Sequence, residues 1–284
     1  MAMDVSKEGA ESTVHEHTYG WRELATYALG IGACRDEELA HLYEGHEGGI
    51  RAYPTYGVIP TFEPVCELMG TAGIAMAQVI HSSQQVNIVR PLPPEGVLET
   101  VATIDGFYDL RRFATVRLST TTRLGGELMF ETTWSIIVQG EGGFGGKRPP
   151  KEASLAVPKG AAPTFERAFA TTNEQALLYR LSGDVNPLHA DPKVAAEAGF
   201  DDGPILHGLC TFGHVGRAVV LELGGGDASR LVAMGGRFSK PVWPGDTIVV
   251  RGWDLDDGEV ALQVAVSERP DPVMTHVWAR LSTT

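Results

Sequence analysis

Apolar and polar residues alternate along two groups of three segments, which predicts two sets of β-strands. Alternation with a period of two places successive side chains on a buried face and a solvent face in turn. The first group predicts strands over Val97–Phe107, Ala114–Thr122 and Leu128–Val138. The second group predicts strands over Thr247–Asp254, Val260–Glu268 and Val273–Leu281. We therefore expect two antiparallel sheets.

A longer apolar segment precedes each group of strands. Pro64–Gln78 and Ile205–Leu223 are rich in glycine and alanine, and such small residues favour a helix packed closely on a sheet. A turn containing proline and glycine then leads into the strands, at Arg90–Gly96 and at Lys240–Asp246. Because helix, turn and strands recur in the same order, we expect a duplicated domain. Chance similarity of two proline turns is the alternative.

Residues 141–163 lie between the two groups and differ from both in composition. Glycines give way there to a stretch rich in proline and alanine, which is typical of a linker. We therefore expect an N-terminal domain over residues 1–140 and a C-terminal domain over residues 164–284. One helix wrapped by an antiparallel sheet, made twice, is an α+β double domain whose two sheets can run together.

Charge and cysteine content restrict the partners and the compartment. The 284 residues include 36 acidic and 23 basic side chains, a net charge of −13, so no nucleic-acid partner is expected. No apolar run approaches the length of a membrane span. The three cysteines, Cys34, Cys66 and Cys210, are widely spaced, which argues against a disulfide framework. With no signal pattern at the start and no peroxisomal address in Leu281–Thr284, we expect a cytoplasmic protein.

Two further patterns do not support a cofactor or a metal. Gly140, Gly142 and Gly145 have the spacing of a dinucleotide fingerprint, but the prolines that follow them prevent a helix from beginning there. His207 and His214 are seven positions apart on the predicted helix, which is about 10 Å of rise. A single ion with bonds of about 2 Å cannot span that distance. We expect neither a cofactor nor a metal site.

The segment from Tyr179 to Pro192 holds the densest set of polar side chains. Asp184, Asn186 and His189 bring a carboxylate, a carboxamide and an imidazole into six residues. A glycine before them permits a sharp turn, so the three side chains can converge on one site. In the alternative interpretation, Asp184 and Asn186 cap their own backbone in an Asx turn and His189 is a solvated neighbour. The spacing alone supports both interpretations equally.

This segment, with Ala195 after it, resembles the signature of the (R)-specific 2-enoyl-CoA hydratases, called hydratase 2, among the MaoC-like dehydratases. Further segments resemble the two-domain form of that family, which includes the hydratase part of the peroxisomal multifunctional β-oxidation enzyme. These segments are Tyr27–Ala33, Pro54–Pro60, Gly142–Gly146, Pro204–Cys210 and Phe238–Val242. The resemblance covers nearly the whole chain from Tyr19. It implies a double hot-dog fold and favours the catalytic interpretation.

The resemblance also implies a reaction and a residue set. The reaction is the reversible hydration of trans-2-enoyl-CoA to (R)-3-hydroxyacyl-CoA, in fatty-acid or sterol side-chain β-oxidation. Asp184 and His189 are the expected catalytic pair, which holds one water, and Asn186 fixes their geometry. Which member is the base stays open, because a shared water couples their titrations.

Further residues are candidates for contacts with the thioester substrate. Gly208 lies at the predicted start of the second helix, where unpaired backbone amides can stabilise an oxyanion. Close packing of that helix on the sheet is the alternative reason for this glycine. Arg237 and Lys240 lie beside the second Pro-Gly turn and are candidates for the CoA phosphates, with a solvated surface as the alternative. Ser182 and His207 complete the expected substrate contacts.

The first half contains no counterpart of the polar segment, so we expect one active site per chain. By resemblance, the first half binds the acyl chain, although its His81–Gln84 sequence departs from the family pattern. A hot-dog thioesterase and a non-catalytic acyl-CoA-binding subunit are the alternative functions. The expected partners are an acyl-CoA thioester and a second copy of the chain in a homodimer.

Overall fold

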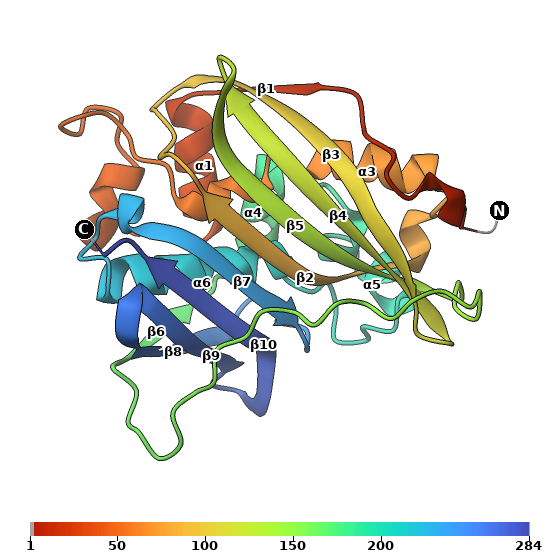
Figure 1. The fold of residues 1–284 in the computed structure, drawn as a ribbon. Helices are drawn as coiled ribbons and strands as arrows, with labels where there is room; N and C mark the ends of the chain where they lie inside the picture. Colours follow the sequence, from red (N-terminus) through yellow and green to blue (C-terminus); the bar gives the residue numbers. More distant parts are fainter. Residues whose placement is uncertain (1–2, 284) are drawn as a thin grey trace.

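A computed structural model describes residues 3–283. Residues 1–2 and Thr284, the last residue of the C-terminal tetrapeptide considered above, lie outside the described part. The chain forms one ten-stranded antiparallel sheet with the order β1-β3-β4-β5-β2-β7-β10-β9-β8-β6 (Figure 1). The strands are β1 (His15–Tyr19), β2 (Val79–Ile88), β3 (Gly96–Asp109), β4 (Phe113–Leu124), β5 (Glu127–Gln139), β6 (Phe165–Ala170), β7 (Leu231–Phe238), β8 (Thr247–Asp254), β9 (Glu259–Val266) and β10 (Arg269–Leu281).

The strand order confirms the duplication. The first five strands and the last five follow the same internal order, and the two sets meet in mirror arrangement at β2 and β7. There Ser83 pairs with Arg237 and Asn87 pairs with Ala233. The two sheets expected from the sequence are therefore one continuous sheet, in which neither β2 nor β7 is left as an exposed edge.

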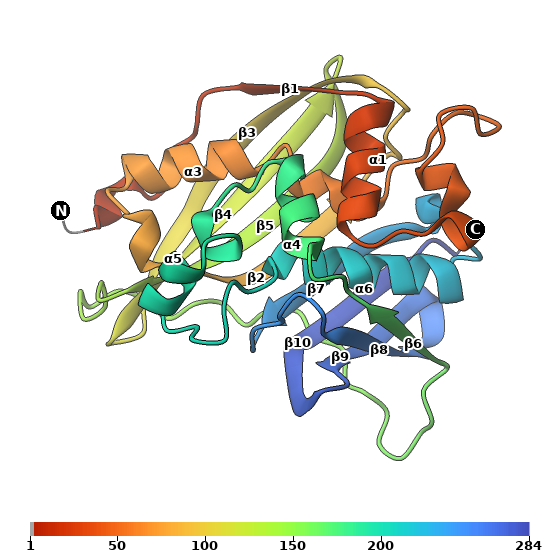
Figure 2. The ribbon, with the colours of Figure 1, turned by 180° about the vertical axis from the view of Figure 1, so that it is seen from behind.

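The α-helices lie on one face of this sheet (Figure 2). They are α1 (Trp21–Gly30), α2 (Arg35–Glu38), α3 (Phe62–Thr71), α4 (Gln175–Tyr179), α5 (Pro192–Glu197) and α6 (Gly208–Glu222). Of these, α3 and α6 follow the order of the repeat, since each precedes the strand that its half contributes to the junction, β2 or β7. One helix against the sheet in each half is the double hot-dog arrangement.

The first long helix is shorter than the sequence predicts. The expected helix over Pro64–Gln78 ends as α3 at Thr71, because Gly73 adopts a φ of +70°. The amide of Ile74 then donates to the Met69 carbonyl and closes the helix end. A short 3-10 turn follows, and β2 begins at Val79. A residue in the left-handed region ends the helix despite the helical propensity of the alanines around it.

The second long helix joins the two halves. Most of α6 is buried, and two of its glycines, Gly213 and Gly216, face the first half of the chain. A Cβ atom added to Gly213 would lie 2.3 Å from Ile31, and one added to Gly216 would lie 2.7 Å from Thr55. Further along α6, Arg217 donates to the carboxylate of Glu38, at 2.7 and 2.5 Å, in a buried ion pair. These contacts hold the first half of the chain against α6 of the second half.

The glycine-rich residues 140–146 do not open a helix. The Asp109 carboxylate accepts hydrogen bonds from the amides of Gly143 and Gly145, which folds the segment into a turn. The chain then runs without strand or helix from Gly140 to Thr164. On the way Glu152 accepts from the Ser83 hydroxyl and pairs with Arg237, beside the junction of β2 and β7.

Candidate active site

The polar segment folds through a series of tight turns. After α4 and the 3-10 turn Arg180–Ser182, Gly183 adopts a φ of +141°, which favours glycine. The Asp184 carboxylate accepts from the amide of Asn186 at 3.1 Å, and the Asn186 side chain accepts from the amide of Leu188 at 3.0 Å. Both are the Asx contacts of the alternative interpretation. Asn186 therefore begins the turn Pro187–His189 and sets its direction.

His189 is buried, and in this respect the alternative interpretation is wrong. Its side chain is 9% exposed. Because a carbonyl oxygen can only accept, the contact of 2.9 Å between Nδ1 and the Ile205 carbonyl fixes the proton on Nδ1. The lone pair of Nε2 is then free to act as a base. Burial holds the pKa of His189 below its usual value, although the Ile205 carbonyl and the charge of Asp184 oppose this shift.

His207 joins Asp184 and His189 in one cluster. One side-chain oxygen or nitrogen from each of the three residues lies within 4.8 Å of those of the other two. The Nε2–H of His207 donates to the backbone carbonyl of Asp184 at 3.0 Å, and its ring stacks on that of His189 at 3.7 Å between centroids. The structure thus brings together three residues that the sequence places up to 23 positions apart.

The residue types of this cluster are those of a metal site, but the ring geometry does not fit one. The two imidazole planes are stacked and inclined by only 28°. A nitrogen lone pair lies in the plane of its own ring, so one ion at about 2 Å from both nitrogens would lie far outside at least one plane. His214 is not a member of this cluster, and its Nδ1–H donates to the Cys210 carbonyl within the helix.

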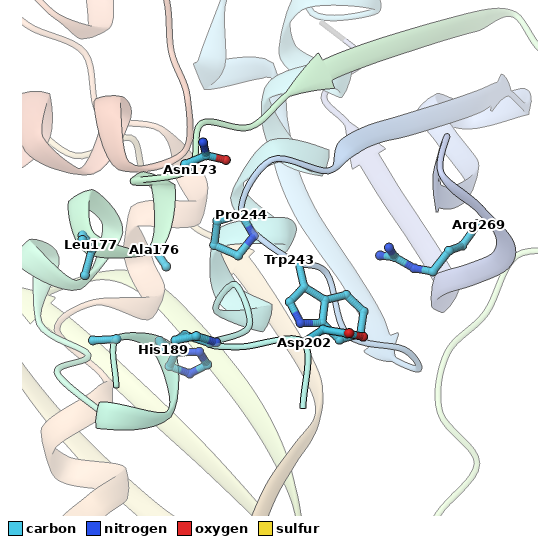
Figure 3. Close-up of a pocket in the computed structure, with 10 residues that line it drawn as sticks. Asn173, Ala176, Leu177, His189, Asp202, Trp243, Pro244 and Arg269 are labelled. Atoms are coloured by element: carbon cyan, nitrogen blue, oxygen red, sulfur yellow. The ribbon is translucent and has the colours of Figure 1, made fainter. Parts of the chain in front are cut away.

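A pocket of about 520 Å³ opens beside His189. Figure 3 shows α4 on one side of it and the turn of Trp243 and Pro244 on the other, with Arg269 farther from His189. The indole N–H of Trp243 is buried without a partner among the described residues, so it can donate to a ligand. Arg269 stacks on Trp243 and pairs with Asp246. The lining residues are Asn173, Ala176, Leu177, His189, Ala190, Asp202, Pro204, Trp243, Pro244 and Arg269.

Sequence analysis missed most of these lining residues. Trp243 lies inside the second Pro-Gly turn, where the sequence predicts contacts only for Arg237 and Lys240 beside the turn. Arg269 begins β10, at a distance in sequence from every motif. A tryptophan in a polar turn was the one signal that pointed to a binding surface.

Gly208 and Ser182 lie at the two ends of this region, and the position of Gly208 fits both of its interpretations. Gly208 is the first residue of α6, as predicted, and its amide is one of those a helix start leaves unpaired. A Cβ atom there would also lie 3.1 Å from the ring of Phe238, so close packing needs a glycine as well. The hydroxyl of Ser182 is buried without a partner among the described residues.

Arg237 and Lys240 are not brought to this pocket. Arg237 pairs with Glu152, and Lys240 lies 3.8 Å from the carboxylate of Asp271. Both side chains are exposed. The cation that lines the pocket is Arg269.

The first half of the chain approaches the polar segment from α3 and the turn before it. A Cβ atom added to Gly183 would lie 4.0 Å from the side chain of Ile59. Burial and the negative charge of Asp184 raise the pKa of the Cys66 thiol on α3 to about 11. Cys66 is therefore uncharged and partly buried near the Asp184 carboxylate.

Comparison with known protein families gives two matches that follow the two halves. Residues 17–140 match the MFE-2 hydratase 2 N-terminal domain, and residues 155–276 match the MaoC like domain. The crystal structure of a MaoC-like dehydratase from Phytophthora capsici superimposes with a TM-score of 0.87, at 33% identity over 98% of each chain. The duplicated fold and its polar cluster thus define a MaoC-like protein.

Two curated relatives refine this assignment. The probable enoyl-CoA hydratase 2 of Dictyostelium discoideum is 36% identical over 87% of this chain and 86% of its own length. The peroxisomal multifunctional enzyme type 2 of Mus musculus is 37% identical over 90% of this chain, which spans 35% of that longer protein. The chain belongs to the hydratase 2 family of two-domain MaoC-like enzymes. No helix in the described part is long and apolar enough to cross a membrane.

Proposed function

We propose that this protein catalyses the reversible hydration of trans-2-enoyl-CoA thioesters to (R)-3-hydroxyacyl-CoA in β-oxidation of fatty-acid or sterol side chains. The observation that carries the proposal is the meeting of Asp184 with a buried, neutral His189 whose Nε2 is free. His189 lines the pocket beside α4. The family relationship supports the reaction type, and it is the basis for the (R) configuration.

Asp184 and His189 act together on one water in this proposal. Hydration requires a proton to leave the water as its oxygen bonds to C3, and a proton to be added at C2. The pair accepts the first proton and supplies the second, so it ends in its starting protonation state. The amide of Gly208 at the helix start donates to the thioester oxygen as negative charge develops there. The Ser182 hydroxyl is an additional substrate contact.

Crotonyl-CoA tests the function directly. We expect the purified protein to remove the absorbance of the conjugated enoyl thioester without releasing free thiol, and to form the (R)-3-hydroxy product on chiral analysis. A chelator should not reduce the rate. Thiol release would identify a thioesterase, and binding without any reaction would identify an acyl-CoA-binding subunit. Mainly (S) product would contradict the stereochemical part.

Arg237 and Lys240 remain our candidates for the CoA phosphates, although each has an acidic neighbour. If they bind the phosphates, alanine at each position should raise KM for crotonyl-CoA several-fold. KM for crotonyl-pantetheine, which carries no nucleotide phosphates, should not change. Arg269→Ala is the informative comparison, since Arg269 lines the pocket. If only Arg269→Ala raised KM for crotonyl-CoA without changing KM for crotonyl-pantetheine, Arg269 and not Arg237 or Lys240 would bind the phosphates.

We assign different roles to the two halves. Residues 1–140 bind the acyl chain, residues 141–163 link the halves, and residues 164–284 carry the chemistry. Ile59 and Cys66 support this division, because they bring the first half close to the polar segment. Separated halves would expose the edges of β2 and β7, so a 160–284 fragment should self-associate. A stable, soluble fragment that hydrates long-chain enoyl-CoA as fast as the full chain would contradict the division.

Location and assembly are further parts of the proposal. We place the protein in the cytoplasm, while the mouse relative is named as peroxisomal; cell fractionation with an antibody decides between the two compartments. We also expect a homodimer. Sedimentation equilibrium should give twice the chain mass of 30.5 kDa, and a single chain mass would exclude the dimer.

A further inference from the structure

His207 has surroundings that differ from those of a substrate-binding residue. It immediately precedes α6, and only 1% of its surface is exposed. It is not among the residues that line the pocket beside His189. Its ring packs between aromatic neighbours, stacked on His189 and tilted against Tyr179 at 4.9 Å between centroids. What it contacts is the catalytic pair itself.

The contacts of His207 reach both members of the pair by different means. Its Nε2–H donates to the backbone carbonyl of Asp184, which holds the turn that presents the carboxylate. Its ring face holds the plane of the His189 imidazole, whose Nδ1–H is already fixed by the Ile205 carbonyl. Burial and the neighbouring His189 keep the pKa of His207 well below its usual value, so its ring stays neutral beside a histidine that takes up protons.

We propose that His207 is a positioning residue for the Asp184–His189 pair, and that it acts through these two residues instead of through the substrate. The idea rests on the proposed hydration reaction. Reacting groups must be held within a fraction of an ångström, and a shift of about 1 Å can cost about 10²-fold in rate. One side chain that contacts both partners keeps their separation constant.

Two substitutions separate the two contacts. His207→Gln keeps an N–H donor for the Asp184 carbonyl but removes the stacked ring, whereas His207→Phe keeps a ring but removes the donor. We expect each to lower kcat on crotonyl-CoA by roughly 10-fold or more, with KM changed less than about twofold. In the Asp184→Asn background, the same substitutions should have little further effect, because the positioned group is already disabled.

His214→Gln is the matched control. His214 lies within α6 and is buried like His207, and its Nδ1–H donates to a backbone carbonyl as the Nε2–H of His207 does, but it does not contact the pair. It should therefore lose stability at unchanged kcat. If His214→Gln lost as much kcat as the His207 variants, the loss in those variants would come from general structural damage and not from positioning of the pair. A raised KM at unchanged kcat, or a full multiplicative loss in the Asp184→Asn background, would show that His207 contacts the substrate.

An NMR measurement on His189 tests the positioning role without depending on enzymatic turnover. In ¹⁵N-histidine-labelled protein, we expect the His189 ring signals and titration midpoint to move in both His207 variants and to stay unchanged in His214→Gln. Signals of His189 that are identical to wild type in both His207 variants would overturn the positioning role. An inactive wild type with shifted His189 signals would instead refute only the hydration reaction.

Discussion

In the proposed mechanism, Asp184 and His189 contribute as a unit, because both act on one reacting water. General acid–base groups contribute about 10² to 10⁴-fold in rate. We therefore expect Asp184→Asn and His189→Ala each to reduce turnover of crotonyl-CoA by ~10²-fold or more, and the double variant to lose little beyond either. Steady-state kinetics of the three variants provide the measurement. A single variant with wild-type turnover would remove its residue from the catalytic pair.

At the scale of the element, α6 depends on glycine for its approach to the first half. Gly213→Ala places a Cβ atom 2.3 Å from Ile31, which is fully buried. Overpacking of this kind typically costs ~1–3 kcal/mol, more than the helix gains from alanine. We expect a lower urea midpoint at an unchanged m-value.

Gly70 on α3 is the matched control for this prediction. It is exposed, and a Cβ atom there would meet nothing within 4 Å. Gly70→Ala should therefore leave stability unchanged or raise it by up to ~1 kcal/mol through helix propensity. If Gly213→Ala were as stable as Gly70→Ala, α6 would not be closely packed on the first half.

At the scale of the whole molecule, a buried ion pair joins the halves. Arg217 is 2% exposed, and it holds the Glu38 carboxylate, which also accepts from the Tyr53 hydroxyl. Burial alone would raise the pKa of Glu38, but the hydrogen bonds and charge of Arg217 bring it below its usual value. Arg217→Met leaves that charge buried and unpaired, and should cost ~3–5 kcal/mol.

Two further variants show whether pairing is the cause. Adding Glu38→Gln to Arg217→Met removes the unpaired charge and should recover most of the loss. Arg251→Met breaks an exposed pair with Glu166 and should cost less than ~1 kcal/mol. Chemical unfolding of the three variants provides the comparison. A double variant no more stable than Arg217→Met would show that the loss comes from packing.

Stability should also depend on pH through the buried histidines. Burial and the charge of Arg217 lower the pKa of His214 from 6.5 to about 3. Below pH 6.5, His214 binds a proton in the unfolded chain but not in the folded chain. The free energy of unfolding is therefore highest above pH 6.5 and falls as the pH is lowered toward about 3. One such group contributes up to about 1.4 kcal/mol per pH unit.

His214→Gln should flatten this slope between pH 4 and pH 6.5, whatever its effect on stability at neutral pH. His276→Asn is the control, since His276 is exposed and asparagine tolerates its φ of 53°. Thermal melts at a series of pH values give both slopes. A slope in His214→Gln equal to that of the control would contradict the burial of a neutral His214.

Local patterns determined much of this protein. Alternation located the six strands that the sequence predicts, and the repeated order of helix, turn and strands predicted the duplication, because both depend on short-range periodicity. Asp184, Asn186 and His189 lie within a few turns of one another, so the sequence alone could place them together. The end of α3 was missed, because the left-handed conformation of Gly73 overrode a helical propensity.

Only the tertiary structure decided the remaining features, because they depend on contacts between distant residues. The pairing of β2 with β7 makes one sheet from two, and Glu38 meets Arg217 across 179 positions. The stacking of His207 on His189 and the pocket between Trp243 and α4 arise where segments from different elements meet. Periodicity and spacing along the sequence do not predict these long-range contacts, since each contact depends on how the whole sheet curves around its helices.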